Sequence, residues 1–153
     1  LVGEAYMYRG GAHGGTEFAS LIWDRESARQ LEIADLFSDF DAALAVLTPL
    51  YCEGLDAERA KKRGQPVAKD GGPFDQCPPL SRQTIVPAAR SGPAEPAPPE
   101  EASDLIERGR IASIRILLAP YEAGPYADGS YVVDVPVTDD VRALIKPEYR
   151  EMF

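Results

Sequence analysis

The stretch Tyr121-Glu122-Ala123-Gly124-Pro125-Tyr126-Ala127-Asp128-Gly129-Ser130-Tyr131 joins two segments that are both typical of β-strands. Residues 111–118 before it are rich in branched aliphatic side chains, and residues 131–137 after it place apolar side chains at every second position. The two glycines of the connection permit a positive φ, whereas Pro125 fixes its own. The sequence therefore predicts a β-hairpin with a compact, tyrosine-lined loop.

The N-terminal part predicts an antiparallel β-meander. Its three predicted strands cover residues 1–8, 17–24 and 30–33. A glycine cluster at residues 10–15 must bend the chain between the first two strands, and the polar residues 24–29 supply the second turn.

The middle of the chain predicts one long amphipathic helix. Ser38 or Asp39 is expected to cap its N-terminus, and Gly64 is expected to end it. The spacing of the apolar residues gives the helix a single core-facing side, formed by Phe40, Ala43, Leu44, Leu47, Tyr51 and Leu55.

Two features of this helix need interpretation. Pro49 lies inside it and predicts a kink or two consecutive helices, with Thr48 capping the second. A basic run suits the negative end of the helix dipole, and we interpret it as a solvated helix end and not as a ligand-binding patch. The run comprises Arg59, Lys61, Lys62 and Arg63.

The remaining segments complete the predicted fold. The proline-rich residues 88–103 predict a flexible loop, and residues 83–86 before it predict a short strand. Thr138 is expected to cap a last short helix that Pro147 ends. The sequence thus predicts a single α+β domain over residues 1–153, in which the antiparallel meander and the C-terminal hairpin pack against one long kinked helix and a short C-terminal helix.

Composition excludes several classes of function. The chain has 153 residues, of which 44% are hydrophobic and 27% charged, as one globular domain requires. Its net charge of -9 disfavours nucleic acids and anionic lipid, since both need basic surfaces, but it suits a basic protein partner. We find no apolar run of roughly 20 residues that would span a bilayer. The chain starts at Leu1 without a signal pattern, so we expect any membrane anchor to lie in an N-terminal part that precedes it.

The two cysteines allow two interpretations. Cys52 lies late in the predicted helix and Cys77 in the proline-rich region, and a disulfide between them would stabilise the fold by roughly 3 to 4 kcal/mol. Two unrelated thiols are the alternative, and composition alone does not decide between them. A zinc site that adds His13 to the two cysteines is disfavoured because no metal-ligand spacing is present, so we expect no metal.

The candidate groups for chemistry or binding are few. His13, the only histidine, is either a base or a turn residue whose imidazole bonds the backbone, and no nucleophile motif accompanies it. Tyr121, Tyr126 and Tyr131 surround the hairpin loop, and they either form a recognition surface or pack inward over the hairpin.

Three segments together resemble a known domain family. They are Tyr8-Arg9-Gly10-Gly11-Ala12-His13-Gly14, Leu31-Glu32-Ile33-Ala34-Asp35-Leu36-Phe37 and Tyr121-Glu122-Ala123-Gly124-Pro125-Tyr126-Ala127-Asp128-Gly129. They are similar, in the same order, to segments of the RsiV-like C-terminal domains, a bacterial extracytoplasmic family of unknown function. The best-known member of that family is a membrane-anchored anti-sigma factor whose outer domain binds lysozyme.

The resemblance implies an α+β domain in the periplasm or cell envelope, on a lipoprotein or a single-pass membrane protein. It favours the disulfide between Cys52 and Cys77 over two free thiols. As partners it implies lysozyme or another basic protein, or peptidoglycan. The chain departs from the family pattern in a Pro/Ala-rich insertion around residues 90–101, and without a sigma-binding segment the anti-sigma role does not carry over.

We therefore expect a non-enzymatic extracytoplasmic binding or sensor module that needs no cofactor. The residues expected to bind are Tyr121, Gly124, Pro125, Tyr126, Gly129 and His13. One alternative is a cell-envelope hydrolase, accessory or catalytic, that uses His13 with a nearby carboxylate. A further alternative is a structural domain whose ligand is its own N-terminal part.

Overall fold

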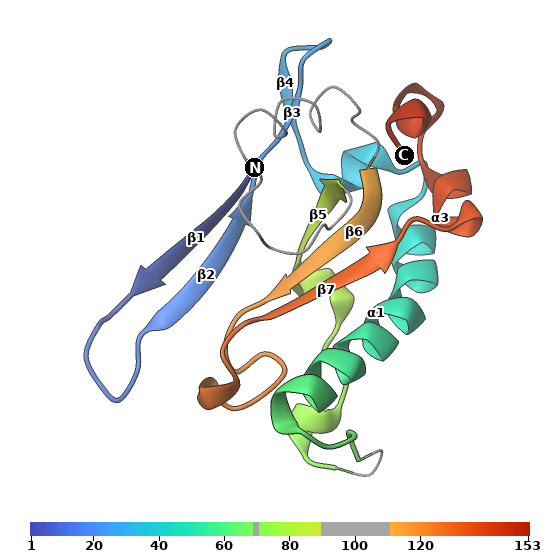
Figure 1. Cartoon of the computed structure of the whole chain (residues 1–153). Coiled ribbons are helices and arrows are strands. Elements are labelled where there is room, and N and C mark those ends of the chain that lie inside the picture. Colours follow the sequence, from blue (N-terminus) through green and yellow to red (C-terminus); the bar gives the residue numbers. More distant parts are fainter. Residues whose placement is uncertain (69–70, 90–110) are drawn as a thin grey trace, which may run out of the picture.

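The computed structural model describes residues 1–68, 71–89 and 111–153 of the chain. It has the predicted α+β class, because one long helix, α1 (Phe40–Arg63), packs against an antiparallel sheet (Figure 1). The sheet contains, in spatial order, β5 (Thr84–Ala89), β6 (Ile111–Leu118) and β7 (Tyr131–Pro136). β6 and β7 are the two strands of the predicted hairpin, with Ile116 opposite Val133.

The core lies between α1 and the sheet. β7 buries every second residue and exposes those between, so the predicted period-two alternation is confirmed. Along α1 the buried residues recur at every fourth position and form one row: Ala43, Leu47, Tyr51, Leu55 and Arg59. Gly54, beside this row, has no side chain to keep α1 away from β7, since a Cβ there would lie 2.7 Å from Val133 Cγ1.

Pro49 does not divide the helix. α1 is one helix of 24 residues, so the predicted alternative of two helices is wrong. Thr48 is not a cap, because its hydroxyl donates to the carbonyl of Leu44 at 2.6 Å inside the helix. Pro49 is solvent-exposed, so the carbonyl that loses its partner can be hydrated, while the apolar face of the same turns packs on the sheet.

Both ends of α1 agree with the sequence. Of the two predicted caps, Asp39 is the one used, since its Oδ1 accepts from the backbone N–H of Ala42 at 3.0 Å. Gly64 ends the helix with φ 68°, and its N–H donates to Ala60.

The N-terminal strands form two separate hairpins instead of one three-stranded meander. β1 (Val2–Met7) pairs with β2 (Gly15–Ser20), and β3 (Ile22–Asp24) pairs with β4 (Arg29–Leu31). The single predicted strand 17–24 is divided at Leu21, which still exchanges two backbone bonds with Leu1 before the chain turns to pair with β4.

The predicted third strand also ends early. Residues 30–33 were expected to be extended, but Asp35 accepts a hydrogen bond from the backbone N–H of Glu32 at 2.8 Å and so starts a 3₁₀ helix, η1 (Ile33–Leu36). This turn leads the chain directly into α1.

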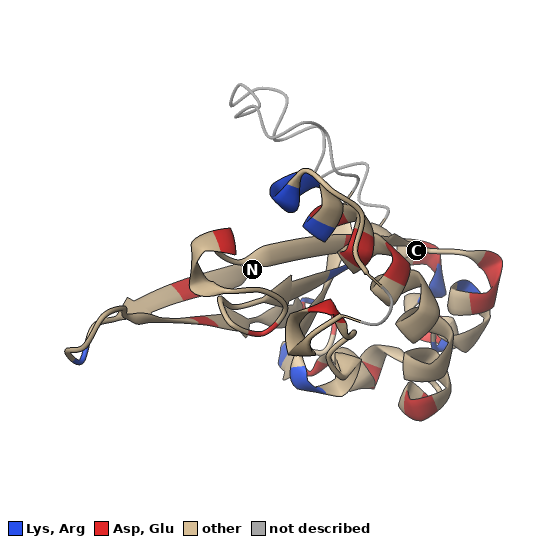
Figure 2. Cartoon of the chain, turned by 90° about the horizontal axis from the view of Figure 1, so that it is seen from below, with Lys and Arg blue, Asp and Glu red and all other residues tan. Residues whose placement is uncertain are grey.

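We call β1, β2 and their turn, residues 2–20, the arm. Figures 1 and 2 both show it extending from the rest of the molecule as a narrow ribbon. Every residue of β1 is exposed, and in β2 only Thr16 and Phe18 are half-buried, so the arm is far less covered than the main sheet. Figure 2 also shows acidic residues spread over several elements of the body.

The C-terminal part closes the other end of the core. α3 (Asp139–Leu144) is capped by Thr138 as predicted, and Pro147 begins a 3₁₀ helix, η5 (Pro147–Met152). Ile145, directly after α3, forms a β-bridge with Phe37.

Short 3₁₀ helices occupy the irregular parts: η2 (Pro73–Asp75), η3 (Leu80–Arg82) and η4 (Tyr126–Asp128). The predicted strand 83–86 is present and longer, as β5. The predicted flexible loop 88–103 begins too early, because Ala88 and Ala89 belong to β5, and its remainder lies outside the described residues.

Candidate functional site

Two segments that are more than a hundred positions apart in the sequence meet at the tip of the arm. His13, in the turn of the arm, stacks face to face on Tyr126 in the β6–β7 loop, with ring centroids 4.1 Å apart and planes at 17°. Tyr121 lies 6.4 Å from His13 and 5.6 Å from Tyr126, with its ring tilted to both. Two of the three segments that carry the family resemblance therefore form one surface.

Tyr6 of β1 completes this group of rings. Its phenol lies against the backbone of Gly14, where any Cβ would overlap the ring. The hydrogen bond between Tyr6 and Tyr126 raises the pKa of the Tyr126 hydroxyl, and burial adds to this effect. We call Tyr6, His13, Tyr121 and Tyr126 the aromatic site. Tyr6 is 60% exposed and Tyr121 54% exposed, so both present ring surface to solvent.

The backbone of Tyr121 is strained. It has φ 74°, a left-handed conformation that is rare for a residue of its size. A bulky residue in this region costs about 1 to 3 kcal/mol, and such strain clusters at ligand sites. Glycine would relieve the strain, yet a tyrosine occupies the position and exposes its ring.

Of the other residues predicted to bind, some are exposed and some are buried. Pro125 is exposed beside Tyr126, but Gly124 is buried beneath the side chains of Asp128 and Tyr131, and Gly129 is half-buried. Tyr131 itself faces the core, where its hydroxyl donates to Asp128 at 2.6 Å and burial raises its pKa. Of the two interpretations of the tyrosines, the inward one holds for Tyr131 and the outward one for Tyr121.

The loop is held from beneath by Arg59, whose side chain is 0% exposed. Its Nε donates to the carbonyl of Ala123 at 2.9 Å, its Nη2 to the carbonyl of Gln76 at 2.8 Å, and its Nη1 to Asp56 at 3.0 Å. The expectation that this residue belongs to a solvated helix end is wrong. The pattern carried a signal for its burial, since Arg59 continues the row of every fourth residue that ends with Leu55.

Arg63 joins the same two segments one turn further on. Its Nη1 donates to Asp75 at 2.5 Å and its Nε to Asp128 at 3.3 Å. Burial alone would lower the pKa of Arg63, but the hydrogen bonds to these two carboxylates outweigh burial and raise it. We call Arg59 and Arg63 the arginine pair.

Lys62 holds the end of the loop. Its Nζ donates to the carbonyls of Asp128 and Ser130 at 2.7 and 2.5 Å and lies 4.1 Å from the centre of the Tyr131 ring. Of the basic run, Lys61 fits the predicted solvated end, since it is 71% exposed and its one ion pair among the described residues is with Glu58.

The disulfide is present between Cys52 and Cys77, with 5.5 Å between the two Cα atoms. It fastens the segment around Gln76 to α1, directly beside the arginine pair. Both cysteines are consumed by this bond, so neither can be a thiolate ligand in the disfavoured zinc site. Within the described ranges we find no group of three or more side chains placed to hold a metal ion.

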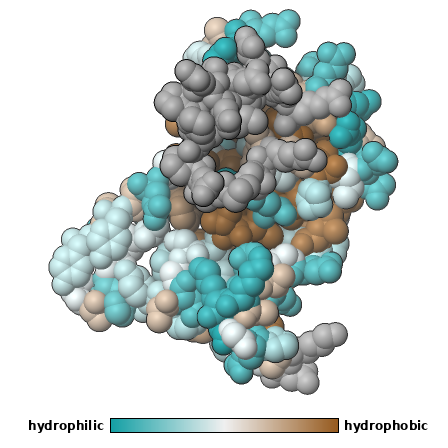
Figure 3. Space-filling view, viewed as in Figure 1, coloured by the Kyte–Doolittle hydropathy of each residue, from teal (hydrophilic) through white to brown (hydrophobic). Residues whose placement is uncertain are grey.

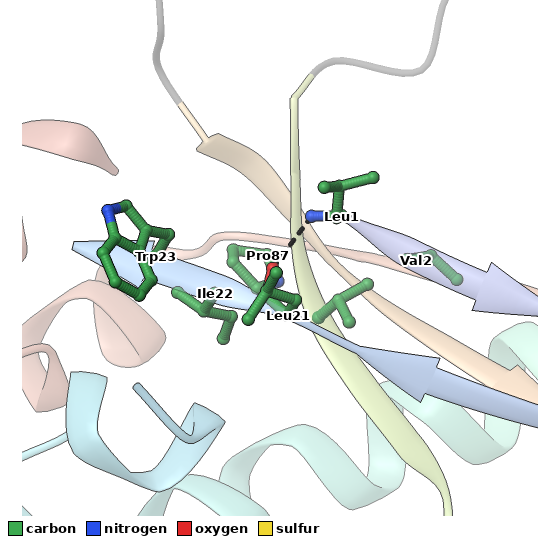
Figure 4. Close-up of a pocket in the computed structure, with 7 residues that line it drawn as sticks. Leu1, Val2, Leu21, Ile22, Trp23 and Pro87 are labelled. Atoms are coloured by element: carbon green, nitrogen blue, oxygen red, sulfur yellow. Dashed lines mark hydrogen bonds between the residues drawn. The ribbon is translucent and has the colours of Figure 1, made fainter. Parts of the chain in front are cut away.

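Hollows adjoin the arm in the part of the chain that the structure describes. One, of about 230 Å³, includes Arg9, His13 and Glu17 beside the aromatic site, and one of about 270 Å³ includes Glu17, Arg82 and Glu122. The third, of about 250 Å³, lies at the opposite end of the arm and is apolar (Figure 4). Its lining consists of Leu1, Val2, Leu21, Ile22, Trp23, Val86 and Pro87.

The surface of the arm differs from that of the body. In Figure 3 the lobe that the arm forms is pale, as expected for tyrosine and glycine, whereas brown apolar atoms gather near the centre of the face. None of the described helices is long and apolar enough to cross a membrane. A comparison of the chain with protein-family models finds no match, and a comparison with curated proteins finds none either.

Proposed function

We propose that this protein is a non-enzymatic extracytoplasmic binding module and that the aromatic site is its binding surface. The observation that carries the proposal is the assembly of four aromatic side chains from the arm and the β6–β7 loop, with the rings of Tyr6 and Tyr121 exposed. Tyrosines bury large areas at low entropic cost and dominate many binding surfaces. The strained backbone of Tyr121 supports a role beyond folding.

The extracytoplasmic location rests on the disulfide, because such bonds persist in oxidising compartments. We further propose membership of the RsiV-like family, on the three segments that resemble it. As partner we propose a basic protein, with lysozyme as the first candidate. The net charge of -9 favours such a partner.

The first test is a calorimetric titration of the oxidised protein with lysozyme, with peptidoglycan fragments titrated in parallel. We expect saturable lysozyme binding that weakens as salt rises. Tyr121→Gly should weaken it by about tenfold or more, as loss of an interface tyrosine does, while leaving the fold equally or more stable. Binding of the peptidoglycan fragments alone would show that the partner is a glycan and not lysozyme. Absence of binding to both would contradict the proposal.

The matched control is Trp23→Ala. Trp23 is an aromatic residue of similar exposure, 56%, but it lies at the apolar hollow on the far end of the arm. If binding is lost equally in Trp23→Ala and Tyr121→Gly, the aromatic site is not the binding surface.

The alternative of a hydrolase that uses His13 makes a different prediction. A catalytic imidazole is commonly oriented by a hydrogen-bonded carboxylate. Among the described residues His13 has ring contacts with Tyr126 and Tyr121 and no such bond. Because His13 belongs to the aromatic site, we expect His13→Ala to weaken binding. A turnover of envelope substrates that this variant abolishes would favour the hydrolase.

A further inference from the structure

The disulfide and the aromatic site are joined by a short path of hydrogen bonds. Cys77 directly follows Gln76, whose carbonyl accepts from Arg59, and the same guanidinium donates to Ala123 in the loop. Ala123 is fully buried and lies between the two loop tyrosines of the site, Tyr121 and Tyr126. Arg59 thus fixes the position of the site's backbone relative to the disulfide.

A second path runs parallel to the first. Arg63 bonds Asp75, two residues before Cys77, and Asp128, two residues after Tyr126. Its Nη2 also donates to the carbonyls of Phe74 and Ala123, at 3.1 and 3.3 Å. The segment at residues 74–77 and the loop at residues 123–128 therefore share both members of the arginine pair as donors.

The segment that carries Cys77 has little regular structure of its own. Between Gly64 and Leu80 its described residues form only η2, a 3₁₀ helix of three residues, and no strand. The disulfide, the arginine pair and the packing of Cys77 against the core hold it in place. Both cysteines are only half-buried, so a small reductant can reach the bond when this segment moves.

We infer that the redox state of the Cys52–Cys77 bond sets the arrangement of the aromatic site and thereby its affinity. The part that concerns affinity rests on the proposed function. With the bond intact, the segment presents its carbonyls to the arginine pair, which holds the loop against His13. With the bond reduced, the segment moves away, Arg59 loses acceptors, and the stack of Tyr126 on His13 loosens.

The chemical step is thiol–disulfide exchange with a dithiol. One thiolate of the dithiol attacks a sulfur of the Cys52–Cys77 bond and forms a mixed disulfide, releasing the other cysteine as a thiolate that takes up a proton. The second thiol of the reductant then displaces the remaining cysteine. Two electrons and two protons pass from the dithiol to the protein, which gains two thiols while the dithiol becomes a disulfide.

His13 provides the readout, because it is the only histidine and gives one set of imidazole signals in a proton–carbon NMR spectrum. In the oxidised protein the Tyr126 ring shields these protons. Reduction with dithiothreitol should move the signals toward those of an unstacked histidine, while circular dichroism shows that α1 persists. Lysozyme affinity should fall about 5- to 150-fold, the usual range of coupling between two sites.

Two variants make the test specific. Cys52→Ala with Cys77→Ala should reproduce the reduced spectrum and should not respond to dithiothreitol. If this double variant does not fold, Asp75→Asn keeps the disulfide and weakens one bond of Arg63, and it should give a smaller shift in the same direction. Lys61→Ala, on the same helix end but outside the arginine pair, should leave the spectrum unchanged.

Two results would overturn the inference. One is an unchanged His13 spectrum when mass spectrometry shows the bond reduced, and the other is a change that appears only with loss of the helical signal. If the spectrum responds but no ligand binds either redox form, the proposed function fails and the structural coupling stands. If the spectrum responds and both redox forms bind lysozyme equally, the proposed function stands and the effect of the disulfide on affinity is refuted.

Discussion

The arm and the layer of α1 on the main sheet are both built from regular elements, yet they are stabilised in different ways. In the layer, Leu47, Tyr51 and Leu55 are completely buried against the sheet. In the arm, all six residues of β1 are exposed. A two-stranded ribbon that is largely exposed to solvent is at best marginally stable on its own.

The arm is therefore positioned by few contacts, and one of them lies in the candidate site. Thr84 Oγ1 donates to the carbonyl of Phe18 at 3.3 Å, and at the tip the stack of His13 on Tyr126 joins arm to loop. We infer that burial in the body supplies most of the free energy of folding. The arm contributes little to stability, and its role is to place side chains in the candidate site. The four predictions below test this division.

The largest effect is expected at Arg59, in the body. Arg59→Leu removes a buried guanidinium and leaves the carbonyls of Ala123 and Gln76 with fewer donors, which should lower the free energy of unfolding by about 3 to 5 kcal/mol. Urea denaturation followed by circular dichroism measures the change. Lys61→Ala, two residues further along α1 and on the surface, should change it by less than about 0.5 kcal/mol. Similar values for the two variants would show that Arg59 is not structural.

The next effect is expected at Gly54, where α1 approaches β7. In Gly54→Ala, the new Cβ would lie 2.7 Å from Val133 Cγ1. Overpacking costs about 1 to 3 kcal/mol and the better helix propensity of alanine returns about 1, so the net loss should be up to about 2 kcal/mol. Adding Val133→Ala should make the Gly54 substitution less harmful in a double-mutant cycle. Simple additivity of the two would contradict a close contact here.

The body is also the region that the sequence predicts well. The period-two pattern of residues 131–137 and the row of apolar residues on α1 are local signals, and burial follows from them directly. Pro49 misled the prediction because tertiary packing stabilises the helix more than one proline in an exposed turn destabilises it. Arg59 misled it because a basic residue near a helix end usually faces solvent, although its spacing placed it in the buried row.

The site was predicted in part. His13 and Tyr126 were each candidates, but no local pattern shows that the turn of the arm and the β6–β7 loop meet, since that depends on how the arm leaves the body. Tyr6 was missed for the same reason, because strand alternation does not identify which loop lies opposite. Gly124 is among the residues expected to bind, whereas the side chains of Asp128 and Tyr131 cover it.

A small stabilising effect is expected at Tyr51 in the core. Its hydroxyl is buried and has no hydrogen-bond partner among the described residues, so Tyr51→Phe should be as stable as the wild type or up to about 1 kcal/mol more stable at neutral pH. Burial raises the pKa of Tyr51 above the ordinary 10.0. The charge of Arg59 opposes this shift, and the charge of Glu122 adds to it.

The pH dependence at Tyr51 follows from that shift. A raised pKa in the folded state gives stability that is present below pH 10.0 and is lost as pH rises above it. Urea titrations on both sides of this pH should show the wild type losing more stability than Tyr51→Phe. Tyr8→Phe, a change at an exposed tyrosine of the arm, should follow the wild type. Equal losses in the wild type and Tyr51→Phe would show that Tyr51 does not titrate differently in the folded protein.

The smallest effect on stability is expected at Gly14, in the arm, where a Cβ would overlap the ring of Tyr6. Gly14→Ala should change the free energy of unfolding by less than about 0.5 kcal/mol, because the arm can shift without exposing the core. It should nevertheless displace Tyr6 and so alter the His13 signals in the NMR spectrum. Gly15→Ala is the matched control, since a Cβ there meets no atom within 4 Å, and it should leave both measurements unchanged. If Gly14→Ala destabilises the protein as much as Gly54→Ala does, the arm and the body unfold as one unit, and the division drawn between them is wrong.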